Sequence, residues 1–252
     1  DCSWHMHAEN RNAQDEFDKE HIPNAIFFDL DKNSKQDTDL PHMLPSLVAW
    51  NEIISDLGIS NDDQIVIYDN SNVISSCRGW YNFIYFGHER ELVSVLDGGL
   101  KKWKIENKIT TNEKTNILKS KYIAKENKHL VKNINEINDN IKRNNFKVID
   151  ARSRERFEGI VPDPRKNVRS GSIPNSLCLP FKEVINSNDN TFKNKNEISK
   201  KFDEIIDLSE KNRVFSCGSG ITACVLSLAY SLVNNTYSPT VYDGSWAEYG
   251  KL

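Results

Sequence analysis

Val214-Phe215-Ser216-Cys217-Gly218-Ser219-Gly220-Ile221-Thr222-Ala223 is the stretch of sequence that decides the fold. It begins with the short apolar pair Val214-Phe215, which is typical of a buried strand. After the glycines an apolar run continues to Leu232 with helical spacing, so one side of a helix can pack against a sheet. The stretch therefore predicts a strand, a tight loop and a helix in direct succession.

The loop between this strand and helix predicts a reactive thiol. Gly218 and Gly220 allow the backbone to curl so that successive N–H groups point at one centre, as happens where anions bind helix starts. The group at that centre is the Cys217 sulfur, and amide donors at a positive helix end favour its thiolate, the nucleophilic form. A buried packing cysteine is the competing interpretation, but a glycine-flanked turn favours catalysis. The packing interpretation is kept for the remaining cysteines, Cys2, Cys77, Cys178 and Cys224.

The chain repeats itself once. Three short motifs of the first half return in the same order about 150 residues later, which indicates a duplicated domain. The pairs are His21-Ile22-Pro23-Asn24-Ala25 with Ser172-Ile173-Pro174-Asn175-Ser176, Ile65-Val66-Ile67-Tyr68-Asp69 with Arg213-Val214-Phe215-Ser216-Cys217, and Asp97-Gly98-Gly99 with Asp243-Gly244-Ser245.

Each half alternates short apolar runs with helical patterns. Leu47 to Leu57 and Ile198 to Ile206 carry apolar residues at helical spacing, between runs that read as buried strands. This alternation predicts an α/β fold of two tandem domains, each a mainly parallel sheet flanked by helices. We expect the first domain at residues 1–110, a polar linker at 111–126 and the second domain at 127–252.

Charge and composition exclude several classes of partner. Lys and Arg (33) are mixed with Asp and Glu (36) for a net charge of −3, so neither nucleic acid nor an anionic membrane is expected. The sequence has no apolar stretch near the length of a membrane span and no signal-like start, which predicts a soluble, cytoplasmic protein. Its five scattered cysteines form no CxxC pair, so reduced thiols are expected rather than disulfides or a metal site.

Several motifs together resemble one family, and the match runs nearly from end to end. They are Cys217-Gly218-Ser219-Gly220-Ile221-Thr222, Tyr242-Asp243-Gly244-Ser245-Trp246, Phe27-Phe28-Asp29-Leu30-Asp31, His42-Met43-Leu44-Pro45 and Val95-Leu96-Asp97-Gly98-Gly99-Leu100. The sequence resembles the rhodanese-like sulfurtransferases, most closely the tandem-domain 3-mercaptopyruvate sulfurtransferases. The resemblance implies that Cys217 carries sulfur as a persulfide. It also implies that the first copy is inactive, with Asp69 at the position of the cysteine.

The same resemblance suggests the sulfur donor and the residues that hold it. Thiosulfate-using relatives place basic residues after the cysteine, whereas this loop is uncharged and resembles the mercaptopyruvate type. Arg156 and Arg165 match the family's pattern for holding the substrate carboxylate, which a guanidinium can bind in bidentate fashion. Without the resemblance, both would read as ordinary surface arginines. The remaining residues of the predicted substrate site are Gly218, Gly220, Ile221 and Thr222.

The resemblance also places a grouping like that of serine hydrolases beside the cysteine. Here it consists of Ser219, His42 and Asp31, the last two from the first half of the sequence. We therefore expect the active site in a cleft between the halves, with neither half active alone. From the residues alone, His42 would read as a loop histidine and Asp31 as a solvated acid.

The predicted reaction moves sulfur from 3-mercaptopyruvate through Cys217 to a small thiol, thioredoxin or cyanide, with release of pyruvate and without a metal or organic cofactor. The first alternative is a thiosulfate:cyanide sulfurtransferase. The second alternative is a cysteine phosphatase, which needs an arginine after five residues that follow the cysteine. Because this chain has Ala223 at that position, phosphatase activity is not expected. A non-catalytic rhodanese-like binding module is the third alternative, and the intact loop with both arginines argues against it.

Overall fold

The chain folds into two compact units. The computed structural model describes residues 1–206 and 212–252. The first unit comprises Asp1–Asp37, Leu44–Asn127 and Ser187–Thr191, and the second comprises Thr38–Met43, Lys128–Asn186 and Phe192–Leu252. The short segment 38–43 therefore belongs with the second unit, although it comes early in the sequence.

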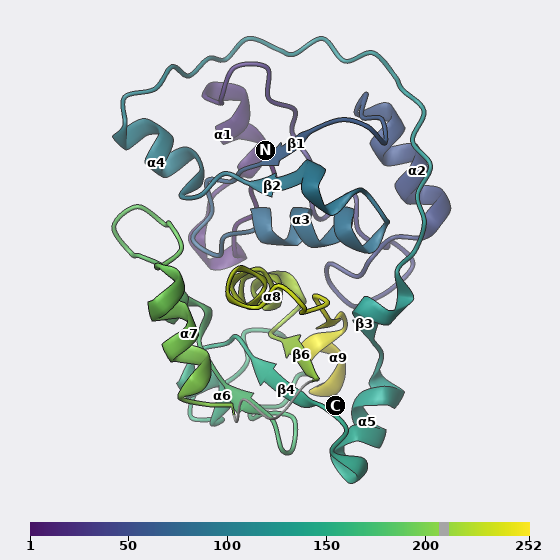
Figure 1. The fold of residues 1–252 in the computed structure, drawn as a ribbon, viewed down its shortest axis with the longest axis vertical. Coiled ribbons are helices and arrows are strands. Elements are labelled where there is room, and N and C mark those ends of the chain that lie inside the picture. The colour runs from purple at the N-terminus through teal and green to yellow at the C-terminus, as the bar shows by residue number, and fades with distance from the viewer. Residues whose placement is uncertain (207–211) are drawn as a thin grey trace. The chain divides into compact units, whose positions relative to one another are not determined.

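The first unit is built on two short parallel strands. β1 (Ile65–Ile67) pairs with β2 (Val93–Val95), with Ile65 opposite Val93, and α3 (Ser76–Tyr85) packs against both strands (Figure 1). Because all residues of α3 are buried, this helix supplies much of the unit's core. The remaining elements of the unit are η1 (His7–Glu9), α1 (Ala13–Lys19), α2 (Leu47–Asp56), η2 (Arg90–Leu92) and α4 (Gly99–Ile105).

Aromatic packing attaches α2 to this unit. The helix begins where the Ser46 hydroxyl accepts a hydrogen bond from the amide of Ala49 at 3.2 Å. Trp50 is fully buried and stacks on Phe86, with ring centroids 4.6 Å apart. Phe83 meets the same indole edge-on at 5.2 Å, a favoured aromatic geometry. The predicted helix at Leu47 to Leu57 is thus present, and its buried face holds it in place.

The second unit contains a five-stranded sheet in the order β3-β7-β6-β4-β5, and all its pairings are parallel. Its strands are β3 (Val131–Lys132), β4 (Lys147–Asp150), β5 (Leu177–Cys178), β6 (Arg213–Ser216) and β7 (Val241–Tyr242). Its helices are η3 (Lys128–Leu130), α5 (Ile134–Arg143), α6 (Arg154–Phe157), η4 (Phe181–Val184), α7 (Lys195–Asp203), α8 (Ile221–Val233) and α9 (Ser245–Tyr249).

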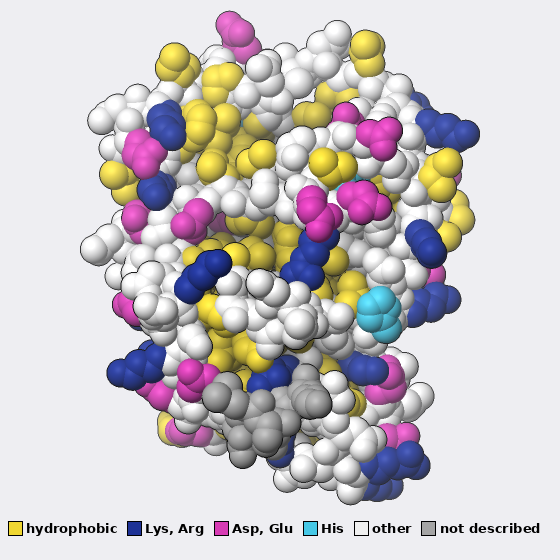
Figure 2. Space-filling view, in the orientation of Figure 1, with side chains coloured by type: hydrophobic (Ala, Val, Ile, Leu, Met, Phe, Trp, Pro, Cys, Tyr) yellow, Lys and Arg dark blue, Asp and Glu magenta, His cyan; other side chains and the backbone are white. Residues whose placement is uncertain are grey.

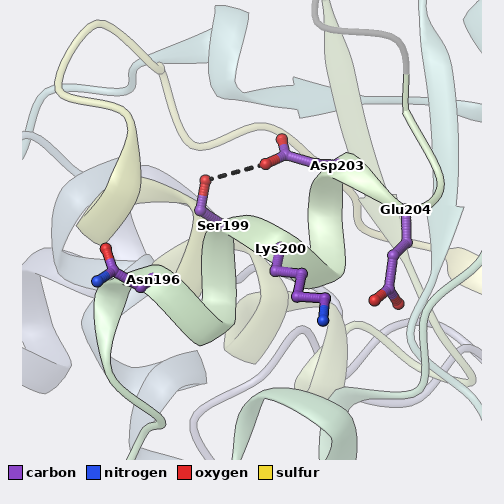
Figure 3. Close-up of a pocket in the computed structure, with 5 residues that line it drawn as sticks. All are labelled: Asn196, Ser199, Lys200, Asp203 and Glu204. Carbon is purple, nitrogen blue, oxygen red and sulfur yellow. Dashed lines mark hydrogen bonds between the residues drawn. The ribbon is translucent and has the colours of Figure 1, made fainter.

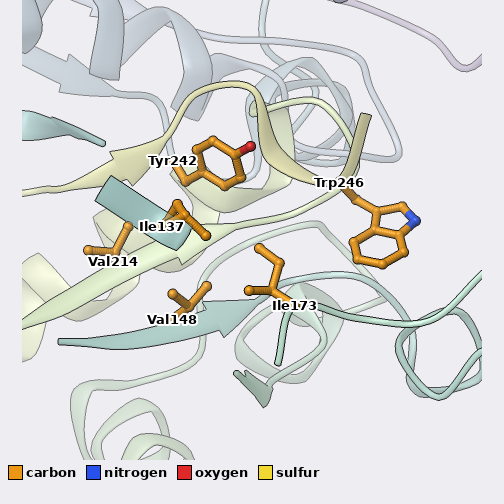
Figure 4. Packing of buried hydrophobic residues seen from close by; sticks show 6 residues of the cluster. All are labelled: Ile137, Val148, Ile173, Val214, Tyr242 and Trp246. Atoms are coloured by element: carbon orange, nitrogen blue, oxygen red, sulfur yellow. The ribbon is translucent and has the colours of Figure 1, made fainter. Parts of the chain in front are cut away.

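A buried apolar cluster joins the sheet of the second unit to α5 and α9 (Figure 4). It draws one side chain each from α5, β4, β6, β7, α9 and the segment before β5, so its burial stabilises all of them together. A capping box fixes the start of α5, because Asn133 and Glu136 satisfy each other's backbone amides. The cluster consists of Ile137, Val148, Ile173, Val214, Tyr242 and Trp246.

α8 packs against β6, β7, α7 and η4. Eight of its 13 residues are buried. Its buried surface is wider than the sequence predicts. Helical spacing predicts burial of Ile221, Val225, Leu228, Ala229 and Leu232. Leu228 and Leu232 are only half-buried, whereas Ala223 and Leu226, outside that set, are fully buried. The difference arises because α7 and η4 cover α8 in addition to the sheet.

Candidate active site

The predicted strand–loop–helix forms as expected in the second unit. β6 ends at Ser216, four loop residues follow, and α8 begins at Ile221. Gly220 precedes the helix with φ of 81°, a left-handed conformation that glycine adopts without steric cost. Cys217 is buried, with 2 % of its surface exposed, and lies beside the positive end of a 13-residue helix.

The first turn of α9 holds this loop by its backbone. The Trp246 amide donates to the Cys217 carbonyl at 2.9 Å, and the Ala247 amide donates to the Gly218 carbonyl at 2.9 Å. The Cys217 amide in turn donates to the Ser245 hydroxyl at 3.1 Å. Three hydrogen bonds therefore fix the backbone on which the cysteine side chain is mounted.

Ser219 and His42 lie in contact. Nδ1 of His42 is 3.0 Å from the Ser219 hydroxyl oxygen, and both side chains are buried. The two residues are 177 positions apart in the sequence, but residues 38–43 belong to the same unit as Ser219. His42 has φ of 61°, a left-handed value uncommon for a residue with a side chain.

Asp31 lies in the first unit. Its two carboxylate oxygens accept hydrogen bonds from the Trp4 indole nitrogen at 3.1 and 3.0 Å. A role of Asp31 in a grouping with Ser219 and His42 stays a prediction.

The two predicted carboxylate-binding arginines reach the residue that follows the cysteine. A Cβ atom placed on Gly218 would lie 3.1 Å from Nη1 and 3.2 Å from Nη2 of Arg165. It would lie 3.4 Å from Nη2 of Arg156. Glycine at this position therefore allows both guanidinium groups to approach the loop closely. Each arginine side chain remains about a quarter exposed, so solvent can reach it (25 % and 28 %).

A buried carboxylate joins these two arginines. Oδ2 of Asp163 accepts from Nη2 of Arg156 at 2.7 Å, and Oδ1 accepts from Nη1 of Arg165 at 3.3 Å and from the Arg165 amide at 3.0 Å. Burial acts to raise the pKa of Asp163, but the hydrogen bonds and the two positive charges outweigh it and hold the pKa below its ordinary value. Asp163 thus stays ionised and holds both cations in place.

The remaining predicted residues line the same turn. Gly220 and Ile221 are buried at the start of α8, and Thr222 is half-buried in its first turn. Neither Asp163 nor Ser245 is predicted from the sequence to have a role, although Ser245 lies in the motif Tyr242-Asp243-Gly244-Ser245-Trp246. An acidic residue between two prolines, close to both arginines, was the available signal for Asp163.

The first unit has a matching strand–loop–helix, with Asp69 after β1. Its carboxylate accepts from the Ser71 amide at 2.7 Å and from the Ser76 amide, the first of α3, at 2.9 Å. Burial raises the pKa of Asp69, and these hydrogen bonds offset only part of that effect. The start of α3 is therefore capped by the chain's own carboxylate.

Other features of the surface do not coincide with these residues. A hollow on α7 is lined by Asn196, Ser199, Lys200, Asp203 and Glu204 (Figure 3). Within it the Ser199 hydroxyl donates to Asp203 at 3.3 Å. On the face drawn in Figure 2, basic and acidic side chains lie interspersed.

Within residues 1–206 and 212–252, no group of three or more His, Cys, Asp or Glu side chains is arranged to hold a metal ion. Over the same residues, no helix has the length and apolar character needed to cross a membrane.

Comparison with known proteins identifies the class. The family model described as the rhodanese-like domain matches twice, at residues 9–106 and 133–252. The chain therefore belongs to the rhodanese-like family and carries two copies of its domain in tandem.

Similar proteins narrow the class further. The chain is 38% identical over 270 residues to thiosulfate/3-mercaptopyruvate sulfurtransferase 1, mitochondrial, of Arabidopsis thaliana, covering 99% of this chain and 70% of the relative. It is 37% identical to the 3-mercaptopyruvate sulfurtransferase of Mus musculus, covering 99% and 83%. The crystal structure of SseA from Escherichia coli, described as a 3-mercaptopyruvate sulfotransferase, matches with a TM-score of 0.83 at 30% identity, covering 94% and 87%. These matches confirm the predicted family, the tandem α/β fold and the predicted enzyme class, a sulfurtransferase.

Proposed function

We propose that this chain is a 3-mercaptopyruvate sulfurtransferase in which Cys217 carries the transferred sulfur. The observation that carries the proposal is the approach of two guanidinium groups to Gly218, the residue next to the buried thiol. A donor with a carboxylate at one end and a thiol at the other can place its charge on the arginines and its sulfur near Cys217.

The first half-reaction forms a persulfide. The Cys217 thiolate attacks the thiol sulfur of 3-mercaptopyruvate, an S–S bond forms, and the donor's C–S bond breaks. The bonding electrons leave on carbon as pyruvate enolate, which takes a proton from solvent or a nearby acid to give pyruvate. Arg156 and Arg165 hold the donor carboxylate throughout, and Gly220, Ile221 and Thr222 form the surrounding wall. Donors at the loop stabilise the negative charge that develops.

The contact between Ser219 and His42 supplies a polar group for this step. Their 3.0 Å separation allows the imidazole to orient the hydroxyl, which can then donate to the enolate oxygen or the donor sulfur. We propose Asp31 as a further catalytic residue, as the family resemblance implies. In catalytic triads a histidine likewise orients a hydroxyl group, and here the same pair of groups would serve a sulfur transfer.

The second half-reaction returns the enzyme to its starting state. An acceptor thiolate attacks the outer sulfur of the Cys217 persulfide, takes that sulfur as its own persulfide, and releases the Cys217 thiolate. We propose a low-molecular-weight thiol or thioredoxin as the acceptor, with cyanide as a laboratory substitute. We also propose a cytoplasmic location. Because the Arabidopsis relative is described as mitochondrial, cell fractionation is the test of this location.

Steady-state kinetics with two donors test this proposal. We expect kcat/KM for 3-mercaptopyruvate to exceed that for thiosulfate by at least about tenfold, since none of the loop residues that follow Cys217 is basic, unlike those of the thiosulfate-using relatives. Thiosulfate is the second candidate donor, because the name of the Arabidopsis relative includes both. A preference for thiosulfate would replace the proposed donor, and turnover of neither would remove the proposed activity.

A further inference from the structure

Ser245 contacts the backbone of the cysteine loop in an unfavourable conformation. It is the first residue of α9, is fully buried, and has φ of 49°, in the left-handed region. Its hydroxyl accepts from the Cys217 amide at 3.1 Å and donates to the Tyr242 carbonyl at 2.9 Å. One hydroxyl therefore links the end of β7 to the start of the loop.

The first unit has the same turn without the hydroxyl. Gly99 is the first residue of α4, with φ of 52°, and the amide of the next residue, Leu100, donates to the Asp69 carbonyl at 2.9 Å. The Trp246 amide donates to the Cys217 carbonyl at the same distance, 2.9 Å. Gly99 and Ser245 thus occupy corresponding positions beside Asp69 and Cys217.

Comparison of the two turns shows what the serine adds. A Cβ atom on Gly99 would lie 2.3 Å from the Asp69 carbonyl oxygen, so the first turn excludes any side chain. The second turn accommodates a side chain in a conformation that glycine would adopt more easily. Strain of this kind persists where the surrounding contacts over-determine it, and here the contact is to Cys217.

We propose that Ser245 is a positioning residue for Cys217. By fixing the Cys217 amide against β7, it sets the direction of the Cα–Cβ bond and hence the position of the sulfur relative to the donor. It does not touch the donor itself. The proposal rests on the proposed function, in which misplacing a nucleophile lowers the rate of the chemical step.

Two variants separate positioning from stability. Ser245→Ala removes the hydroxyl and keeps the strain, whereas Ser245→Gly removes both, so the glycine variant should melt at the higher temperature of the two. We expect both to lower kcat for pyruvate release by about tenfold, with KM for 3-mercaptopyruvate changed less than about twofold. Ser231→Ala is the matched control, because its hydroxyl donates to the Ser227 carbonyl at 2.9 Å within α8 and should leave kcat unchanged.

A purely structural role gives a different pattern. Activity would then follow stability, and Ser245→Gly would regain the wild-type kcat, which would overturn the proposal. A raised KM with unchanged kcat would overturn it as well.

A second readout needs no sulfur donor. The rate at which iodoacetamide alkylates Cys217, followed on its peptide by mass spectrometry, should fall in both Ser245 variants by about the same factor as kcat. Equal alkylation rates in wild type and variants would contradict the positioning role. If the wild type releases no pyruvate, the proposed function fails, while the alkylation comparison still decides the role of Ser245.

Discussion

The two strand–loop–helix connections of this chain share one backbone arrangement but carry different chemical groups. In the first unit, Asp69 turns its carboxylate back to cap α3 through the amides of Ser71 and Ser76. In the second unit, the corresponding position holds Cys217, and two arginines reach the adjacent Gly218. A helix start that attracts negative charge is satisfied by the chain's own carboxylate in the first copy, whereas the proposed function assigns a charged substrate to it in the second. The comparison shows that the same fold can carry different chemical groups at this position, so the proposed activity depends on the loop residues.

The same substitution in both loops gives the largest expected contrast. Cys217→Ser removes the sulfur that accepts and passes on the transferred atom, so pyruvate release should fall by at least about 1,000-fold. Asp69→Ser should leave kcat/KM within about twofold of wild type, because that carboxylate caps a helix in the first unit. Steady-state assays of pyruvate release measure both.

Purified variants must first show wild-type circular dichroism, so that a loss of activity does not reflect a loss of folding. Substantial turnover in Cys217→Ser would contradict the catalytic role of the second loop. A comparable loss of activity in Asp69→Ser would contradict the purely structural role of the first loop.

The arginines that distinguish the second loop should produce the next largest effect. Arg156→Ala and Arg165→Ala each remove a cation from the donor carboxylate, and we expect kcat/KM to fall by about 100-fold, mainly through KM. Arg154→Ala is the control, since that arginine pairs with Glu183 at 2.6 Å and is half exposed. Equal small effects at all three positions would mean that the donor carboxylate binds elsewhere.

In the first loop, removal of the carboxylate should affect stability instead. Asp69→Ala leaves the buried amides of Ser71 and Ser76 without their acceptor, which should reduce the free energy of unfolding by about 2 kcal/mol. Urea unfolding followed by tryptophan fluorescence measures the change. An unchanged midpoint would indicate that water replaces the carboxylate at no cost.

The smallest effect is a difference in pH dependence between two carboxylates. The pKa of Asp163 is held below its ordinary value of 3.8, so its stabilising contribution is present above that pH and is lost as pH falls through the lowered value. The pKa of Asp69 is raised by burial above 3.8, so stability declines as pH rises through that higher value.

Asparagine variants should remove these dependences one at a time. Asp163→Asn should flatten the stability profile on the acid side, and Asp69→Asn should flatten the decline above 3.8. Urea unfolding between about pH 3 and about pH 7 tests both. Identical profiles for the two variants would contradict the assigned surroundings.

The sequence contained enough information for the second loop but less for its neighbours. Local spacing predicts β6, the glycine turn and α8, because each depends on residues adjacent in sequence. Arg156 and Arg165 could be predicted only from family motifs, since their approach to Gly218 depends on tertiary packing. The link through Asp163 joins side chains only two and seven positions away, but it depends on how the loop after α6 folds back. The contact of Ser245 with Cys217 joins residues 28 positions apart. No periodicity or propensity indicates such contacts, and the same applies to the place of His42 in the second unit.

The most direct measurement is the mass of the Cys217 peptide after the protein is treated with 3-mercaptopyruvate and blocked before reduction. Sulfur transfer through this thiol predicts an added mass of about 32 Da, one sulfur atom, on that peptide and its loss after incubation with a thiol acceptor. Pyruvate release without any added sulfur on Cys217, or the added sulfur on another cysteine, would contradict the assignment of the second loop as the site of transfer.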